Sequence, residues 1–398
     1  MGAIPRKWLT DAGLTDRGRD RKQLPSLTHN AGTAGAILMT EKLTVPPLSF
    51  THVGLPSRVV FGAGSLSTLN AEIDHLGARR ALVLATPFQK AEGERIAAIL
   101  GDRYAGLFDR AEMHVPIETA REAREFAKRL GADCAVTVGG GSTTGLGKAI
   151  ALESSLPILA IPTTYAGSEV TTIYGITEGG QKKTGRDPRV LPRTVIYDPE
   201  LTLGLPVGMS VTSGMNAIAH AVEGLYAQDA SPITDMISED GIRALAAGLP
   251  RVVASPRDRA ARSDCLYGAW LCGTALGSVG MALHHKLCHV LGGTWNLPHA
   301  ETHTIVLPQA ISYNAQAAAR QLERAGRALG NPNVAQALFD LAAGLGASMA
   351  LRDIGMKESE LDRAAELAVQ SPYYNPRPIE RGAIRALLDD AFFGRRPK

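Results

Sequence analysis

Residues 138–152 read VGGGSTTGLGKAIAL and come directly after the apolar run CAVTV at residues 134–138. Consecutive glycines between a strand and a helix let the backbone approach an anion, which the free N–H groups and the helix dipole then favour. The spacing is neither GxGxxG nor GxxxxGKS/T, so neither common nucleotide-binding fingerprint applies. On these residues alone, a tight turn that needs small side chains is the alternative interpretation.

Short apolar runs alternate with longer amphipathic segments around this stretch. The runs lie at residues 58–62, 81–86, 134–138, 158–162 and 194–198. Amphipathic segments such as residues 117–131 lie between them, which is typical of βαβ units around a parallel sheet. From about residue 209, alanine and leucine at helical spacing predict an all-helical region. We therefore expect an α/β dinucleotide-binding domain with a parallel sheet, followed by an all-α domain.

The chain of 398 residues is long enough for two such domains. We place the α/β domain at residues 46–204 and the helical domain at residues 205–398. Residues 1–45 are mostly polar and aperiodic, which predicts a loose tail. An upstream start-site extension before Met39 and a transit peptide both remain open for this tail.

The composition of the chain excludes some classes of binding partner. The formal charge is only +3, with basic residues scattered along the chain, so neither nucleic acid nor a membrane surface is an expected partner. No apolar stretch approaches the ~20 residues needed to cross a bilayer. Four cysteines, Cys134, Cys265, Cys272 and Cys288, form no CxxC pair, which favours a reduced, cytoplasmic setting.

A second polar turn, IPTTYAGSEVT at residues 161–171, also follows a strand. Its Thr163, Thr164, Ser168 and Glu169 are expected at the carboxyl edge of the sheet, where open α/β sheets bind ligands. Thr86 ends the strand where strict NAD enzymes commonly carry an acidic residue, and Lys90 follows, so we expect both NADH and NADPH to bind. The predicted cofactor-binding residues are Thr86, Gly139, Gly140, Gly141, Ser142, Lys148, Thr163, Thr164 and Ser168, with the pyrophosphate on Gly139 to Ser142.

Histidines are concentrated in the helical half. Six of the ten lie in two stretches, NAIAHAVEG and LHHKLCHVLGGTWNLPHAETH. Asn216 and His220 are four residues apart, as are His285 and His289, so each pair shares a helix face. His299 and His303 follow. A single helical histidine is more often structural than functional, but this concentration favours a site.

The ordered motifs FGAGSL, GGGS, PTT…GSE, DPELT, GMNAIAHAVEG, HHKLCHVLGGTWNLPHA and NPRP resemble the iron-containing (group III) alcohol dehydrogenase family over residues 50–390. The resemblance implies the dehydroquinate synthase-like fold of that family, a site between the two domains, and a homodimer. In metal-dependent members, an aspartate matching Asn216 joins histidines matching His220, His285 and His299 around the ion.

This sequence departs from that pattern in three places. Asn216 replaces the only anionic ligand, and a carboxamide binds a divalent cation far more weakly than a carboxylate. Gly145 stands where the family usually has an aspartate, and PHAETH replaces PHG. The departures resemble a branch of the family that reduces the conjugated carbon–carbon double bond of maleylacetate to 3-oxoadipate in aromatic compound degradation and is thought not to need metal.

The resemblance thus implies an NADH- or NADPH-dependent oxidoreductase without a metal, acting on a small dicarboxylate. Its catalytic residues would be His220, His285, His289, His299 and Asn216, with Asn216, His220, His285 and His299 forming a degenerate metal site. Two alternatives stay open: a metal-dependent alcohol or polyol dehydrogenase of the same family, and a non-catalytic nucleotide-binding protein.

Overall fold

The computed structural model describes residues 50–398 except 53, 56, 180 and 371, so the predicted tail lies outside the described residues. A parallel sheet has the strand order β1-β8-β5-β4-β2-β3. Its strands are β1 (Arg58–Phe61), β2 (Ala81–Leu84), β3 (Tyr104–Phe108), β4 (Cys134–Gly139), β5 (Ile158–Pro162) and β8 (Thr194–Tyr197). The predicted parallel sheet is therefore confirmed.

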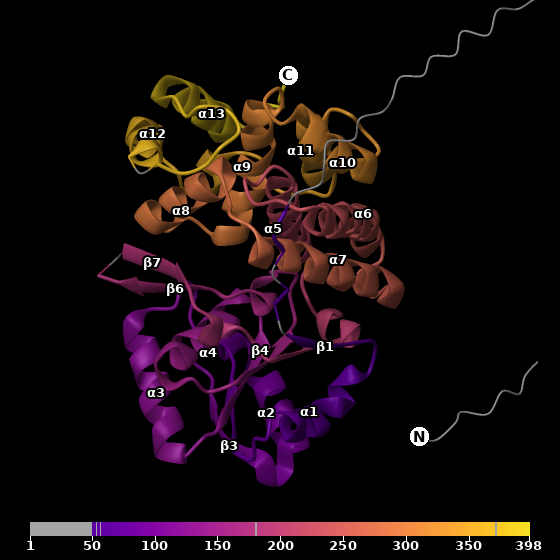
Figure 1. The fold of residues 1–398 in the computed structure, drawn as a ribbon, viewed down its shortest axis with the longest axis vertical. Helices are drawn as coiled ribbons and strands as arrows, with labels where there is room; N and C mark the ends of the chain where they lie inside the picture. Colours follow the sequence, from indigo (N-terminus) through magenta and orange to yellow (C-terminus); the bar gives the residue numbers. More distant parts are fainter. Residues whose placement is uncertain (1–49, 53, 56, 180, 371) are drawn as a thin grey trace, which may run out of the picture. The chain divides into compact units, whose positions relative to one another are not determined.

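Helices cover both faces of this sheet (Figure 1). Side chains alternate along each strand, so Val83 and its neighbour Leu82 pack into different cores. Val83 faces α1 and α2, whereas Leu82 faces α3 and α4. The helices are α1 (Leu69–His75), α2 (Lys90–Leu100), α3 (Ile117–Leu130) and α4 (Gly141–Ser154). Because helices cover both faces of the sheet, we expect the functional residues in the loops at the ends of its strands.

Three strands have no counterpart among the predicted runs. One is β3, an edge strand of the sheet, and the other two form an antiparallel hairpin, β6 (Ile173–Glu178) with β7 (Gln181–Arg186). The β7 sequence QKKTGR has none of the apolar alternation that predicts a strand. Arg186 donates to the carbonyl oxygens of Gly277 (2.9 Å) and Val279 (2.6 Å), which ties the hairpin to the helical region.

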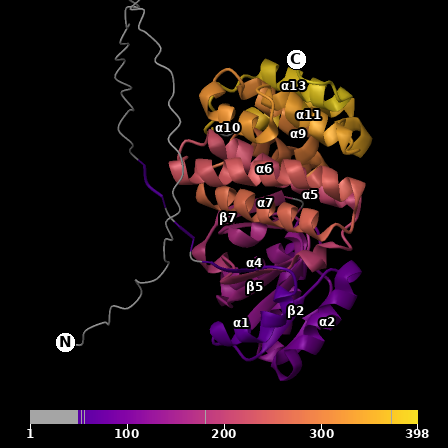
Figure 2. The ribbon, with the colours of Figure 1, turned by 90° about the vertical axis from the view of Figure 1, so that its right-hand side faces the viewer.

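In the part of the chain that the structure describes, only helices follow the last strand, as predicted. They are α5 (Val207–Leu225), α6 (Pro232–Ala254), α7 (Arg259–Ser278), α8 (Leu283–Trp295), α9 (His299–Asn314), α10 (Ala319–Leu329), α11 (Val334–Gly344), α12 (Leu361–Val369) and α13 (Arg381–Phe393). Figures 1 and 2 show α5, α6 and α7 between the sheet and the helices α9, α10, α11 and α13, whereas Figure 1 shows α8 beside the strand β7. The boundary between residues 204 and 205 precedes α5, and the division into two domains there stays a prediction.

No single described helix is both long and apolar enough to cross a membrane. The pair α7 and α8 meets the length and composition test only when taken together, across a 95° bend.

The loop after β5 meets α7 backbone to backbone. Gly167 has φ +81°, and a β-carbon added at Gly273 would lie 2.6 Å from the Gly167 carbonyl oxygen. No side chain fits between these two segments. The fully buried Arg262 of α7 holds the same loop, because its guanidinium donates to Tyr165 Oη at 3.2 Å.

Candidate functional site

The two polar turns of the sequence lie side by side. Thr163 N donates to Gly139 O at 2.9 Å, and Gln89 Nε2 donates to Thr163 Oγ1 at 2.7 Å. A β-carbon on Gly140 would lie 2.8 Å from Thr164 Oγ1. Neighbouring parallel strands β4 and β5 therefore bring the predicted Gly-rich and Thr-rich turns to one edge. Gln89, which links them, was not among the predicted residues.

The glycine turn has the form of an anion-binding helix start. Gly139 has φ +142°, a conformation that favours glycine, and α4 begins at Gly141 with Gly140 as its N-cap. The first turn of α4 contains no acidic residue, and a β-carbon at Gly141 would meet nothing within 4 Å. Gly141 is exposed and Ser142 partly exposed. The turn has both the open space and the positive helix end that a phosphate needs.

Lys148 lies in surroundings that do not suit its predicted contact with the cofactor. Its buried Nζ lies 2.7 to 2.9 Å from four oxygens: the carbonyls of Ser168, Thr171 and Ile173, and Thr171 Oγ1. An ammonium group has three hydrogens, so none is left for a phosphate. We correct its role to that of a brace between α4 and the loop after β5. Glu169 is also internal, since its buried carboxyl group accepts from Tyr197 Oη at 2.8 Å.

The strand β2 ends at Leu84, two residues before Thr86, which was predicted to end it. The Thr86 hydroxyl contacts Gln89 (3.2 Å to Oε1). Lys90 Nζ lies 3.3 Å from Asp109 Oδ2, one residue beyond the end of β3. This exposed lysine is therefore paired with a carboxylate.

The structure brings all six clustered histidines together, from three helices. His220 comes from α5, His284, His285 and His289 from α8, and His299 and His303 from α9. Ring centres are 5.0 Å apart for His220 and His285, 6.3 Å for His285 and His289, and 4.3 Å for His299 and His303. His284 and His303 are fully buried, His299 is partly exposed and His289 is exposed. The four histidines predicted as catalytic thus form one cluster with an open side at His289.

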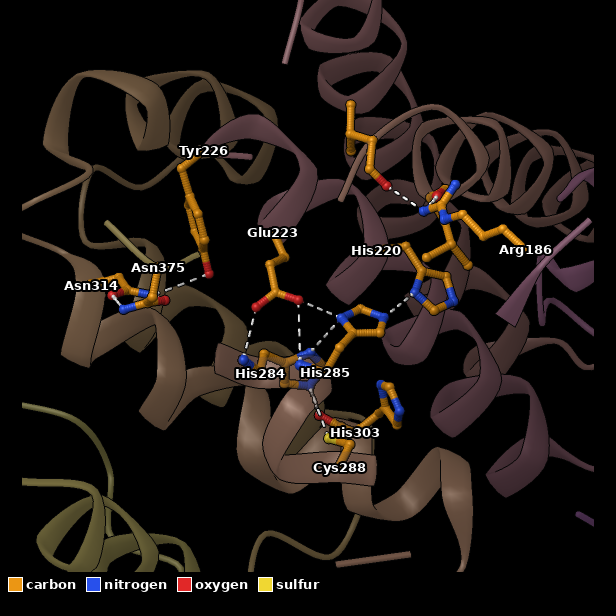
Figure 3. Close-up of polar contacts among 12 residues, drawn as sticks. Arg186, His220, Glu223, Tyr226, His284, His285, Cys288, His303, Asn314 and Asn375 are labelled. Atoms are coloured by element: carbon orange, nitrogen blue, oxygen red, sulfur yellow. Dashed lines mark hydrogen bonds and ion pairs between the residues drawn. The ribbon is translucent and has the colours of Figure 1, made fainter. Parts of the chain in front are cut away.

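A buried carboxyl group anchors the cluster (Figure 3). Glu223 Oε2 lies 2.5 Å from His285 Nδ1, and His285 Nε2 lies 2.8 Å from His220 Nδ1. His220 Nε2 then lies 3.3 Å from the carbonyl oxygen of Ala166, in the loop after β5. Glu223 also accepts the backbone N–H of His284 (2.8 Å) at the start of α8. Sequence analysis missed Glu223, although it stands three residues after His220 and so shares its helix face.

Burial controls the charge state of this cluster. It lowers the pKa of His284 and of His285 to about 3. A charge on His285 would lower the pKa of His284 further, and a charge on His289 would lower that of His285. It also lowers the pKa of His220 and raises that of Glu223. Burial disfavours the charged form of each group. The buried histidines are therefore uncharged at neutral pH, and burial also favours the protonated form of Glu223.

Lys182 supplies positive charge beside the cluster. It lies on β7, is partly buried, and among the described residues has no acidic partner within ion-pair distance. Burial lowers the pKa of His299, and the charge of Lys182 lowers it further. No sequence signal indicated Lys182, because its hairpin was itself not predicted.

The family resemblance implies a divalent metal for other members, which would need ligand atoms of suitable spacing in this histidine cluster. His284, His285 and His303 have ligand nitrogens within 4.8 Å of one another. Two nitrogens bound to one tetrahedral ion at ~2.0–2.1 Å would lie about 3.4 Å apart, whereas His220 Nδ1 and His285 Nε2 lie 2.8 Å apart and bond to each other. The Asn216 Oδ1 atom is buried without a partner in the described structure, and the Glu223 carboxyl is already occupied. The His220–His285 contact and the neutral amide of Asn216 therefore do not match the ligand set of the metal-dependent members, although His284, His285 and His303 lie close enough together to share an ion.

The fold and site define a class: a nucleotide-binding α/β region followed by helices that carry a histidine cluster. Residues 56–199 match the family described as iron-containing alcohol dehydrogenase, and residues 210–392 match its C-terminal part. The chain belongs to the iron-containing alcohol dehydrogenase family.

Several of the similar proteins within the family are maleylacetate reductases. The chain is 63% identical over 340 residues to a maleylacetate reductase from Burkholderia cepacia, covering 85% of this chain and 97% of that protein. It is 57% identical to a maleylacetate reductase from Pseudomonas sp. (strain P51), covering 88% of this chain and 100% of that protein. The crystal structure of maleylacetate reductase from Agrobacterium tumefaciens superposes with a TM-score of 0.85 at 54% identity, covering 88% and 99% of the two chains.

Proposed function

We propose that this chain is an NADH- or NADPH-dependent maleylacetate reductase. The observation that carries the proposal is its high identity to the Burkholderia cepacia enzyme over nearly the whole length of that enzyme. The residue pattern supports it independently, because Asn216 stands one helical turn before His220, at the position where metal-dependent members of the family carry an aspartate.

The reaction needs hydrogen-bond donors rather than a strong Lewis acid. Maleylacetate carries a ketone conjugated to a C=C bond, with a carboxylate at each end. Hydride from the nicotinamide adds to the carbon β to the ketone and leaves an enolate, whose charge spreads onto the former ketone oxygen. Protonation of the α carbon then gives 3-oxoadipate. Donors of suitable pKa stabilise such an enolate.

The chain supplies groups for each part of this chemistry. We assign the cofactor pyrophosphate to the turn Gly139 to Ser142, beside Thr163 and Thr164. His220, His285, His289 and His299 are the candidate donors, and Lys182 adds positive charge that favours a dicarboxylate. Asn216 lies one helical turn before His220 on α5 and offers an uncharged, buried amide.

We further propose a cytoplasmic homodimer with no nucleic-acid or membrane partner. The four cysteines are all buried and unpaired, which suits a reducing compartment. The dimer follows only from the family resemblance.

The test is NADH oxidation with maleylacetate, with 3-oxoadipate identified as the product by mass spectrometry. Turnover that requires maleylacetate supports the proposal. Turnover only with alcohols, lost on chelation, would establish the metal-dependent alternative, whereas cofactor binding without any turnover would establish the non-catalytic one.

A further inference from the structure

The strand β7 presents Lys182 on the same face as Arg186. Side chains alternate along a strand, so Lys182 and Arg186 point to one side of the hairpin and Lys183 to the other. Arg186 donates to the carbonyl oxygens of Gly277 and Val279, at the end of α7. Lys182 therefore lies on the side of the hairpin that faces the helices, where β7 contacts α8.

The position of Lys182 is set by the fold. A β-carbon added at Gly175 of β6 would lie 2.9 Å from Lys182 Cε, so the lysine stem lies over this glycine. The hairpin itself is held at both ends of β6: Lys148 Nζ donates to Ile173 O at 2.7 Å, and Thr177 Oγ1 donates to the carbonyl oxygen of the loop after β3 at 2.8 Å. The ammonium group is thus carried by an anchored strand.

This ammonium group lacks a partner of opposite charge. Among the residues that the structure describes, no acid lies within ion-pair distance of Lys182, whereas Lys183 pairs with Glu178 at 2.6 Å. Burial lowers the pKa of Lys182, because it disfavours the charged form. A bound carboxylate would compensate this buried charge.

The charge of Lys182 acts on the open side of the histidine cluster. Burial lowers the pKa of His289 to about 4, and the charge of Lys182 is the next cause, as it is for His299. His289 is exposed and His299 partly exposed. An anion bound to Lys182 therefore lies beside two of the candidate donors to the enolate.

We propose that Lys182 binds the substrate carboxylate next to the ketone and thereby makes the site specific for a dicarboxylate. This inference rests on the proposed function. In maleylacetate, one carboxylate is attached to the carbon that receives the hydride, so it faces the nicotinamide. The other is separated from the ketone carbon by a single CH₂ group, which places it beside the ketone oxygen that the histidines would meet.

The substitution Lys182→Met tests this role, with Lys183→Met as its matched control. Methionine keeps an unbranched stem over Gly175 and removes the charge. The substrates are maleylacetate and cis-4-oxopent-2-enoate, which lacks only the carboxylate next to the ketone. We expect Lys182→Met to lower kcat/KM for maleylacetate by ~10- to 100-fold, mainly through KM. Its kcat/KM for the shorter substrate and its Kd for NADH should stay within about threefold of wild type.

Equal losses on the two substrates, an equal loss of NADH affinity, or an equal effect of Lys183→Met would overturn the inference. Titration calorimetry of the cofactor-loaded protein with adipate, a dicarboxylate of the same chain length, needs no turnover. Lys182→Met should weaken adipate binding about tenfold, and unchanged binding in a variant of wild-type Tm would also overturn the inference. A wild type that binds adipate through Lys182 but does not reduce maleylacetate would instead refute the proposed function alone.

Discussion

Gly140 and Thr164 lie so close that a β-carbon added at Gly140 would come within 2.8 Å of Thr164 Oγ1 and 3.0 Å of its Cγ2. The next residue, Gly141, would place the same carbon in open space. Two adjacent glycines therefore serve different needs: the first allows two turns to touch, and the second leaves room for a ligand.

The pair Gly140→Ala and Gly141→Ala separates these needs. Gly140→Ala should lower the unfolding free energy by about 1–3 kcal/mol, because a turn must shift to admit the methyl group. Gly141→Ala should leave Tm unchanged but weaken NADH binding about tenfold, or ~1.4 kcal/mol, if the pyrophosphate approaches this backbone. Thermal unfolding and fluorescence titration measure the two effects. Wild-type NADH affinity in Gly141→Ala would place the pyrophosphate elsewhere.

NADPH should be used as well as NADH, because Thr86 offers no carboxylate to repel a 2′-phosphate. We expect kcat/KM values for the two cofactors to differ by less than about a thousandfold, or ~4 kcal/mol. Lys90→Ala should lower kcat/KM for NADPH more than for NADH, with the exposed Lys128→Ala as its control. A larger preference for NADH would show that another group, such as Asp109, excludes the phosphate.

Activity should not depend on metal, because the histidines bond to one another and Asn216 supplies no charge. Protein purified without added metal should contain far less than one Fe or Zn per chain and keep its turnover in EDTA. Elemental analysis and steady-state assays check this. Stoichiometric metal, with activity lost on chelation and restored by Fe²⁺ or Zn²⁺, would contradict it.

Lys148 should matter for stability. Lys148→Met removes the donor for four buried oxygens and should lower the unfolding free energy by about 3 kcal/mol in urea. Lys183→Met is the matched control: the Lys183 side chain is 68% exposed and among the described residues pairs with Glu178 alone, so its loss should cost less than about 0.5 kcal/mol. Equal effects of the two substitutions would show that the buried contacts contribute nothing.

Acid should destabilise the fold. His284 and His285 have pKa values lowered from 6.5 to about 3, so the unfolded chain binds protons that the native chain does not in the window between these values. Stability therefore falls as pH drops through this window, by up to ~1.4 kcal/mol per pH unit for each histidine.

The raised pKa of Glu223 offsets part of this loss, since the native chain binds that proton more tightly. Calorimetry at pH values of about 7.5 and 5 should nevertheless show a clearly lower Tm in acid. An unchanged Tm would mean that the histidines are already charged in the native protein.

Short apolar runs were enough to predict five of the six strands of the sheet, because buried parallel strands such as residues 134–138 are largely continuous apolar runs, whereas the edge strand β3 was missed. The hairpin β6–β7 was missed because its strands are held by backbone pairing and by the Arg186 contacts to α7, which leave no apolar pattern. The spacing of residues in two helices was enough to predict that histidines cluster.

The partners toward which individual side chains point could not be predicted from the sequence pattern. Lys148 turns inward to carbonyl oxygens that come from a loop twenty or more residues away in sequence. Glu223 acts on residues more than sixty positions later. Both partnerships exist only once the chain has folded.

The contact between Gly167 and Gly273 limits how this protein can change over evolution. Backbone touches backbone there, so no side chain acts as a spacer that a mutation could lengthen or shorten. Variants that acquire a new substrate range are expected to keep this spacing and to vary the hairpin. Lys182 lies there on β7, which in the described structure pairs with β6 alone.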